Sequence, residues 1–172
     1  MEIMENVKKS ADVMSPEALL EHWQGHRRLT RKVIAAFPEK NFFAFSVGGM
    51  RPFAVLAMEI LDLTEFGITG IITGRYPSIH DLPHHENNHK KMPKTKADFL
   101  EKWDDVTAQL NDLWQQIPLE RFQEMEVAFG QYENAVINSI FYYIDNEIHH
   151  RAQGTVYLRA LGIEPPMFWD RY

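Results

Sequence analysis

Apolar residues recur every three or four positions over long parts of the chain, and shorter segments rich in proline, glycine and histidine separate these parts. The first long segment carries such a stripe at Leu19, Trp23, His26, Thr30, Val33 and Phe37. This spacing places the stripe on one face of a helix. Ser15 followed by Pro16 is typical of a helix start, and Pro38 of a helix end. The pattern therefore predicts a helix between them.

Three further segments have helical periodicity. They run from Pro52 toward Ile72, from Thr95 to Pro118, and from about Glu133 to Leu161. Thr95 with Asp98 three positions later resembles a capping box. Gly162 ends the last segment as a glycine just beyond a helix, and Pro165 with Pro166 prevents its continuation.

The connections between these segments differ in composition. Residues 39–50 are apolar and contain glycine, residues 74–93 have a loop-like composition, and residues 119–131 predict a short irregular connection. The best strand candidate, residues 68–73, also fits the end of a helix. We therefore predict an all-α fold, an antiparallel four-helix bundle with a long second crossover.

The whole chain, 1–172, is expected to form one domain. Residues 1–14 are polar and predict a loosely ordered lead-in. Residues 163–172 carry Phe168, Trp169 and Tyr172, which a free tail would not keep in water. We expect this tail to pack on the bundle or on a partner subunit.

Composition excludes several classes of function. The net charge of −6 and the absence of a long basic run argue against nucleic-acid binding. The chain has no cysteine, so a disulfide framework, a thiolate metal site and a cysteine nucleophile are excluded. No apolar run is long enough to span a bilayer, and the first residues do not resemble a secretory signal. A soluble, cytoplasmic protein is expected.

A polar stripe on the predicted fourth helix is the strongest candidate for a site. Its members are spaced three or four residues apart: Tyr143, Asn146, His150, Gln153 and Tyr157. Residues at this spacing lie on one side of a helix. Two interpretations remain open: a buried hydrogen-bond network that fixes helix register, or a metal site, for which only His150 is a good ligand.

Two other groups could carry chemistry. Asp62 on the second helix needs a partner if it faces inward, and His150 or Arg151 could supply one; alternatively this turn lies at the solvated edge and only Met58 is buried. The second group consists of histidines in the loop, with the spacing of ligand pairs: His80, His84, His85 and His89. Pro83 lies inside the first pair and argues against a helix there, so a solvated loop is expected.

The end of the fourth helix resembles the DinB/YfiT-like family. The resemblance rests on the segments His149–Gln153 and Tyr157–Gly162 with the prolines beyond, and on Met50–Phe53 at the start of the second helix. It implies an antiparallel four-helix fold and a divalent metal, zinc or nickel, held by three histidines. It also implies thiol S-transferase, isomerase or hydrolase activity, and a homodimer.

The metal ligands of the family are largely missing from this sequence. His150 matches the last ligand, but Asn146 and Met58 stand where the resemblance places the other two histidines. A thioether and an amide bind zinc or nickel poorly. We therefore predict a DinB-like protein whose metal site is lost.

The pocket between the second and fourth helices would then bind a small molecule. The residues expected to line it are Met58, Asp62, Tyr143, Asn146, His150 and Gln153. One alternative is a metal-dependent transferase or hydrolase with a shifted site of His150, Asp62 and Asn146, to which Glu59 could contribute. Another is a non-catalytic structural or interaction module.

Overall fold

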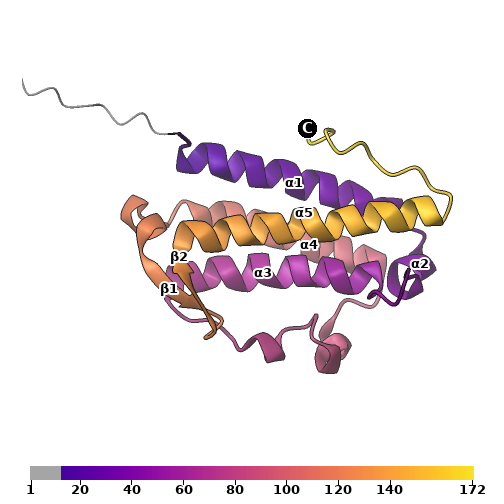
Figure 1. Cartoon of the computed structure of the whole chain (residues 1–172), viewed down its shortest axis with the longest axis horizontal. Coiled ribbons are helices and arrows are strands. Elements are labelled where there is room, and N and C mark those ends of the chain that lie inside the picture. Colours follow the sequence, from indigo (N-terminus) through magenta and orange to yellow (C-terminus); the bar gives the residue numbers. More distant parts are fainter. Residues whose placement is uncertain (1–12) are drawn as a thin grey trace, which may run out of the picture.

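The computed structural model describes residues 13–172, which form a bundle of four long helices (Figure 1). The helices are α1 (Pro16–Ala36), α3 (Phe53–Thr73), α4 (Lys96–Trp114) and α5 (Val136–Ala160). Helices α1 and α3 do not face each other directly; each packs against both α4 and α5. The predicted all-α bundle is confirmed. Within residues 13–172, no helix carries an apolar stretch that could cross a bilayer.

The long crossover between α3 and α4 sets the directions of the helices. It spans residues 74–95 and returns the chain to the end of the bundle at which α3 began (Figure 1). Two short 3₁₀ helices, Ile79–Asp81 and Glu86–Lys91, lie within it. As a result α3 and α4 run in the same direction, whereas the pairs α3–α5 and α1–α4 are antiparallel.

The predicted helix boundaries agree closely with the structure where the sequence carries a cap. Ser15 Oγ accepts a hydrogen bond from the amide of Ala18 at 3.2 Å, and Thr95 Oγ1 accepts one from the amide of Asp98 at 3.1 Å. A helix end is fixed in a similar way at the C-terminus of α3. There Gly74 adopts a φ of 69°, which residues with a side chain rarely adopt. Local chemistry therefore fixes these ends.

Some elements differ from the sequence-based expectation. The apolar connection contains a short helix, α2 (Glu39–Ala44). Residues 68–73 form the end of α3, which was one of the two interpretations left open for them. The segment expected to be irregular instead forms a β-hairpin of β1 (Met125–Ala128) and β2 (Tyr132–Ala135). Because residues 132–135 pair with β1, α5 begins at Val136 and not near Glu133.

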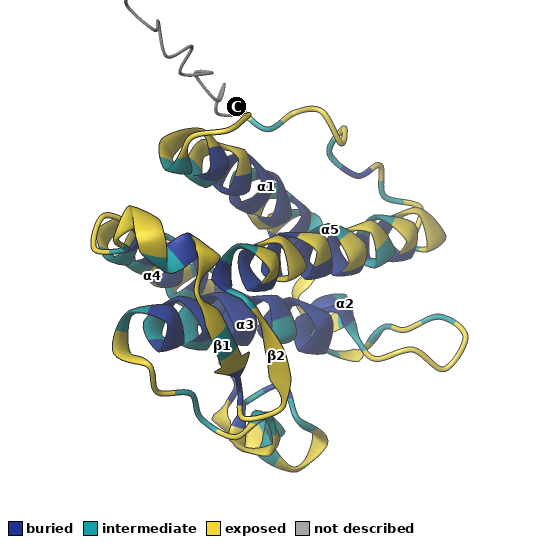
Figure 2. Ribbon diagram, turned by 60° about the vertical axis from the view of Figure 1, so that its left-hand side comes forward, coloured by how far each residue is buried: buried dark blue, intermediate teal, exposed yellow. Residues whose placement is uncertain are grey.

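The core consists of two clusters of buried apolar residues, one toward each end of the bundle. Figure 2 shows that buried residues lie on the inward sides of the long helices. At the end near α2, Phe37, Phe42 and Phe53 pack on one another with ring centroids 4.9–6.0 Å apart. At the hairpin end, Trp23 and Trp114 lie edge to face with centroids 6.3 Å apart. Buried polar residues occupy the middle of the bundle between these clusters.

The C-terminal tail turns back beside α1 (Figure 1). Lys32 forms an ion pair with Asp170 at 2.9 Å, and Arg28 donates to the backbone carbonyl of Arg171 at 2.6 Å. The side chains of Phe168 and Trp169 remain 69% and 63% exposed. Polar contacts thus hold the tail on the bundle. The predicted lead-in lies mostly outside the described residues.

Candidate functional site

Glu59 connects α3 to the polar stripe of α5. Its Oε1 accepts hydrogen bonds from Asn146 Nδ2 at 3.0 Å and from His150 Nε2 at 3.1 Å. Its Oε2 lies 2.7 Å from a guanidinium nitrogen of Arg51. Burial raises the pKa of Glu59, but the hydrogen bond and charge of His150, with Asn146 and Arg51, outweigh it and lower the pKa below its ordinary value. Glu59 is therefore a carboxylate at neutral pH.

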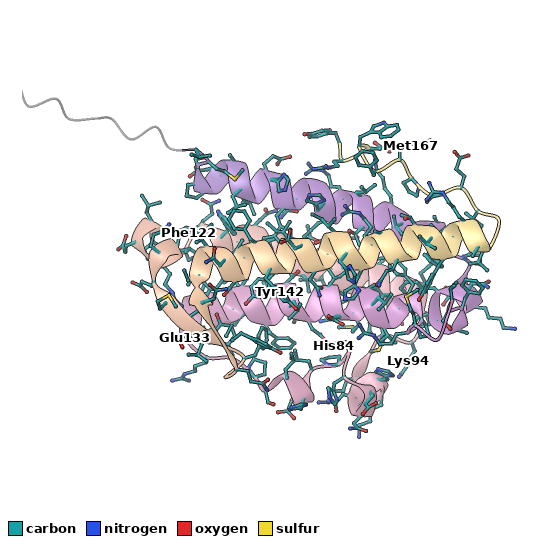
Figure 3. The ribbon with its side chains drawn as sticks, viewed as in Figure 1. His84, Lys94, Phe122, Glu133, Tyr142 and Met167 are labelled. Carbon is teal, nitrogen blue, oxygen red and sulfur yellow. The ribbon has the colours of Figure 1, made fainter. Side chains whose placement is uncertain are left out.

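Asp62 is paired with a histidine from the crossover. Its Oδ2 accepts from the backbone amide of His84 at 2.9 Å and lies 2.7 Å from Nδ1 of the same residue. Both side chains are buried, and Figure 3 shows His84 on the crossover beside α3. A carboxylate facing Nδ1 fixes the proton there, so Nε2 of His84 is left as an acceptor.

Each of the two carboxylate–histidine pairs, Glu59–His150 and Asp62–His84, contributes one residue to the wall of a cavity of about 200 Å³. Glu59 and His84 supply its charged and imidazole groups. Most of the remaining wall is apolar or aromatic and comes from α3, α5, the crossover and the hairpin: Leu63, Ile79, Ala128, Phe129, Tyr132, Tyr142 and Tyr143. A few polar groups on an apolar wall are typical of small-molecule sites.

The hairpin closes this cavity with a strained residue. Phe129 adopts a φ of 53°, a conformation that costs a residue with a side chain about 1–2 kcal/mol. Its ring is buried and lies 5.2 Å from the ring of Tyr76. The strain is thus tolerated at a position that places an aromatic ring in the cavity wall.

The residues present do not fit a three-histidine metal centre. Met58 is fully buried in the apolar core at the α2 end, and Asn146 turns its amide nitrogen, which cannot ligate a metal, toward Glu59. His150 is left with one carboxylate, whereas a catalytic zinc is usually held by three protein ligands. Within residues 13–172, no group of three or more His, Asp or Glu side chains converges in a way that could hold a metal ion.

The predicted site residues divide into three sets in the structure. Asn146, His150 and Gln153 lie together, since His150 Nδ1 is 2.8 Å from Oε1 of Gln153. Tyr143 lines the cavity, while Met58 does not. Asp62 forms the third set, because it pairs with His84 from the crossover.

Two expectations about the crossover need correction. The partner of Asp62 is His84, not His150 or Arg151. The histidine-rich loop is also not uniformly solvated, because His84 is only 9% exposed. Pro83 prevents a helix, and the chain beyond it folds back so that the backbone and ring of His84 both bind Asp62. His80, by contrast, is exposed and His85 is half-buried, and their ring nitrogens lie 3.2 Å apart.

Sequence reasoning underestimated Glu59 and missed the hairpin. Glu59 was expected only as a possible addition to a shifted metal site, yet it is the acceptor for both Asn146 and His150. Its position three residues before Asp62 on one helix was a usable signal, since side chains at this spacing lie on the same side. No local pattern placed Phe129 or Tyr132 beside α3.

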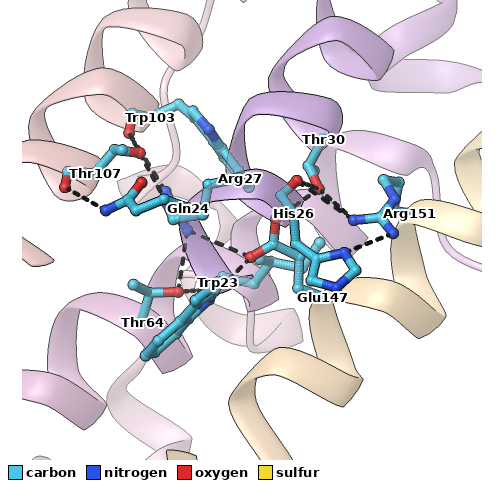
Figure 4. Close-up of polar contacts among 11 residues, drawn as sticks. Trp23, Gln24, His26, Arg27, Thr30, Thr64, Trp103, Thr107, Glu147 and Arg151 are labelled. Atoms are coloured by element: carbon cyan, nitrogen blue, oxygen red, sulfur yellow. Dashed lines mark hydrogen bonds and ion pairs between the residues drawn. The ribbon is translucent and has the colours of Figure 1, made fainter. Parts of the chain in front are cut away.

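A second buried polar network lies on the other side of α5, between α1, α3 and α4 (Figure 4). The Glu147 carboxylate accepts hydrogen bonds from Trp23 Nε1 at 3.2 Å and Thr30 Oγ1 at 2.6 Å. The guanidinium of Arg27 lies 3.7 Å from it. Arg27 also donates to Thr107 at 2.7 Å and stacks 4.0 Å over the ring of Trp103. This network joins four helices and borders no part of the first cavity.

Comparison with known proteins identifies the family. The sequence profile of the DinB family matches residues 6–171. A crystal structure of a DinB-like protein from Bacillus cereus aligns with a TM-score of 0.67 and 17% identity, covering 88% of this chain and 95% of that one. A DinB-like protein from Bacillus subtilis aligns with a TM-score of 0.67 and 18% identity, covering 90% and 99%.

At these identities the two structures establish likeness of fold alone. None of the curated proteins compared with the chain shows significant similarity to it. The family profile nevertheless spans almost the whole sequence, from the lead-in to the tail. The chain therefore belongs to the DinB family.

Proposed function

We propose that this DinB-family protein binds a small, largely apolar molecule in the cavity between α3, α5 and the hairpin, without a metal. The observation that carries the proposal is the imidazole of His84 in the cavity wall, with its Nδ1 on buried Asp62 at 2.7 Å. This pairing leaves Nε2 as an acceptor among aromatic side chains. A ligand with one hydrogen-bond donor and an aromatic body matches that wall.

The environment of Glu59 supports a role in shaping the cavity. Its carboxylate is held from three sides, by Arg51, Asn146 and His150. A group held in this way is fixed before any ligand arrives, so little ordering cost remains for binding. We therefore expect Glu59 and its three partners to form a rigid part of the cavity wall, and His84 to supply the polar contact to the ligand.

A second candidate function is acid–base catalysis in the same cavity. An imidazole held by a buried carboxylate is the arrangement in which histidine accepts a proton from a bound substrate. The Asp62–His84 pair meets this requirement, with both side chains buried. In this alternative His84 Nε2 takes the proton and Asp62 holds the ring and stabilises the resulting imidazolium.

Phenol is a suitable first probe, with anisole as its counterpart that lacks the donor. We expect phenol to bind in calorimetric titration and anisole to bind about five- to tenfold more weakly, because only phenol can donate to His84. Ala128→Leu, which fills the cavity wall from β1, should abolish phenol binding. Val127→Leu, one residue earlier and 52% exposed, is the matched control and should not.

Equal affinities for phenol and anisole would contradict the role of His84, and unchanged binding by Ala128→Leu would contradict the location. Metal dependence is tested separately, by plasma mass spectrometry of untagged protein purified without a metal column. Near-stoichiometric zinc or nickel would overturn the metal-free proposal. A Glu59→His, Asn146→His double variant should take up zinc, since it places two imidazoles beside His150 at positions that are in contact in this structure.

A further inference from the structure

A second cavity, of about 310 Å³, lies between α1, α5 and the C-terminal tail. The α1 helix and the tail that line it lie on the opposite side of α5 from α3 and the crossover (Figure 1). Much of its wall is apolar, from Leu29, Val33, Ile148, Pro166 and Phe168. Its nitrogen-bearing side chains are His26, Arg151 and Arg171. An apolar cavity whose hydrogen-bond donors are cationic or neutral is suited to an anion with an apolar body.

The donors converge on the ring of His26. Arg151 Nη2 lies 3.1 Å from His26 Nδ1, and because a guanidinium can only donate, Nδ1 is the acceptor. The neutral ring then carries its proton on Nε2. That nitrogen lies 3.4 Å from Nη1 of Arg171 and 3.3 Å from a ring nitrogen of His22. Arg171 Nη1 therefore faces a nitrogen that also carries a proton, and the acceptor available to His26 Nε2 is the ring nitrogen of His22.

The cavity also holds positive charge without a matching carboxylate. Arg151 is only 6% exposed, and its contacts are with the backbone and ring of His26 and the hydroxyl of Thr30. Glu147, one turn earlier on α5, faces Arg27 and accepts from Trp23 and Thr30. Among residues 13–172, no carboxylate lies within ion-pair distance of Arg151 or Arg171.

The pKa of His26 agrees with this surplus of positive charge. Its pKa is lowered to about 3, first by burial and then by the positive charges of Arg151 and Arg171, with a smaller effect of His22. The imidazole thus stays neutral at neutral pH and keeps its Nε2 proton as a donor. Buried charges in proteins are normally paired or neutralised. Buried Arg151 has no carboxylate in direct contact, since Glu147 acts on it only at longer range, and half-buried Arg171 adds a second guanidinium group at the same cavity. Together they indicate a site for an anion.

We propose that this cavity binds a small organic carboxylate with an apolar body. The carboxylate accepts hydrogen bonds from Arg171, His26 and Arg151, and the apolar body lies against Leu29 and Phe168. The tail closes the cavity and is itself held on α1 by the ion pair of Lys32 with Asp170. This site is independent of the proposed function of the first cavity.

Octanoate is the probe, and octanol is its neutral counterpart. We expect saturable octanoate binding in calorimetric titration and binding of octanol at least about tenfold weaker, because charge-assisted hydrogen bonds to the guanidinium groups are lost. Arg171→Gln should weaken octanoate binding by about tenfold or more, and Arg171→Lys by less. Arg159→Gln, which removes an exposed arginine from the same end of α5, should leave it unchanged.

Three results would overturn the proposal: no saturable octanoate binding in the millimolar range, equal binding of octanol, or an equal effect of Arg171→Gln and Arg159→Gln. Arg171 is on the tail, so its replacement leaves the bundle core intact, and an unchanged far-ultraviolet circular dichroism spectrum verifies this. The Ala128→Leu variant should bind octanoate as the natural protein does. Loss of octanoate binding in that variant would place the carboxylate in the first cavity and overturn the assignment.

Discussion

The two sides of α5 carry buried polar residues of different kinds. Toward α1, Glu147 has a donor for each oxygen and an arginine opposite, and Arg27 donates to both Thr64 and Thr107. Toward α3, the amide oxygen of Asn146 and Oδ1 of Asp62 are buried without any hydrogen-bond partner among the described residues. The Glu147–Arg27 network is therefore closed, whereas the Asp62 and Asn146 side has acceptors left over.

This difference separates residues that hold the bundle together from residues that are available to a ligand. Buried polar groups in folded proteins normally find partners, and the exceptions require a separate reason. Burial raises the pKa of Asp62, and the hydrogen bonds from His84 offset only part of that effect. Keeping Asp62 ionised therefore costs stability, as is common at functional sites. Glu147, by contrast, has a hydrogen-bond donor for each of its carboxylate oxygens.

The largest expected effect is loss of the Glu147 charge. Glu147→Gln would leave Arg27, which is 0% exposed, as a buried cation without a counterion. The pKa of Arg27 is already lowered to about 10 by burial, against the opposing effect of Glu147. We expect the free energy of unfolding to fall by about 3–5 kcal/mol in urea titration.

Glu65→Gln is the matched control, because Glu65 pairs with Lys102 at 2.7 Å near the surface of α3 and α4. Partly exposed pairs of this kind contribute about 0–1 kcal/mol. Similar losses in the free energy of unfolding for the two variants would show that the Glu147–Arg27 network is not the closed structural unit that its geometry indicates.

The helical part of the fold was predictable because its signals are local. Ser15, Pro16 and Thr95 mark helix starts through side-chain and backbone chemistry that needs no tertiary information. The hairpin was missed because its strands have only four residues each and alternate weakly in polarity. Its formation depends on packing over α3 and α5, which a single sequence does not encode locally.

The candidate site was only partly predictable. The i, i+4 relation of Asn146 and His150 placed them together correctly, since both contact Glu59. The partner of Asp62 could not be read in the same way. His84 is 22 positions away in the chain and meets Asp62 only because the crossover folds back past Pro83. The sequence also carries no local sign that Arg27 is fully buried, because its burial depends on Glu147 from another helix.

A smaller effect is expected from pH, and it tests the α1 side. The folded pKa of His26 is about 3, whereas its ordinary value is 6.5. Below pH 6.5 the unfolded chain therefore binds a proton that the folded protein does not, and the contribution of His26 to stability falls as the pH is lowered toward 3. The slope should stay under the about 1.4 kcal/mol per pH unit that one fully linked proton gives.

The measurement is urea unfolding between pH 7 and pH 5, above the range in which most carboxylates titrate. His26→Gln is compared with the natural protein, so that the shared effects of the other histidines cancel. We expect the difference in stability between the two proteins to change in favour of the variant as the pH falls. A difference that is constant over this range would contradict the neutral state of His26.

The smallest change in stability is expected for Asp62→Asn, although it alters the cavity directly. Asparagine can still accept from the backbone amide of His84, and the buried charge is removed, so the free energy of unfolding should change by less than about 1 kcal/mol. Because the folded pKa of Asp62 is raised, its ionisation costs stability as the pH rises above about 4, and the variant should gain on the natural protein over that range. Without the carboxylate, the proton on Nδ1 of His84 is no longer fixed and phenol binding should weaken. A loss of about 3 kcal/mol, equal to that of Glu147→Gln, would instead show that Asp62 holds the fold together, and that the Asp62–His84 pair does not differ in kind from the Glu147–Arg27 network.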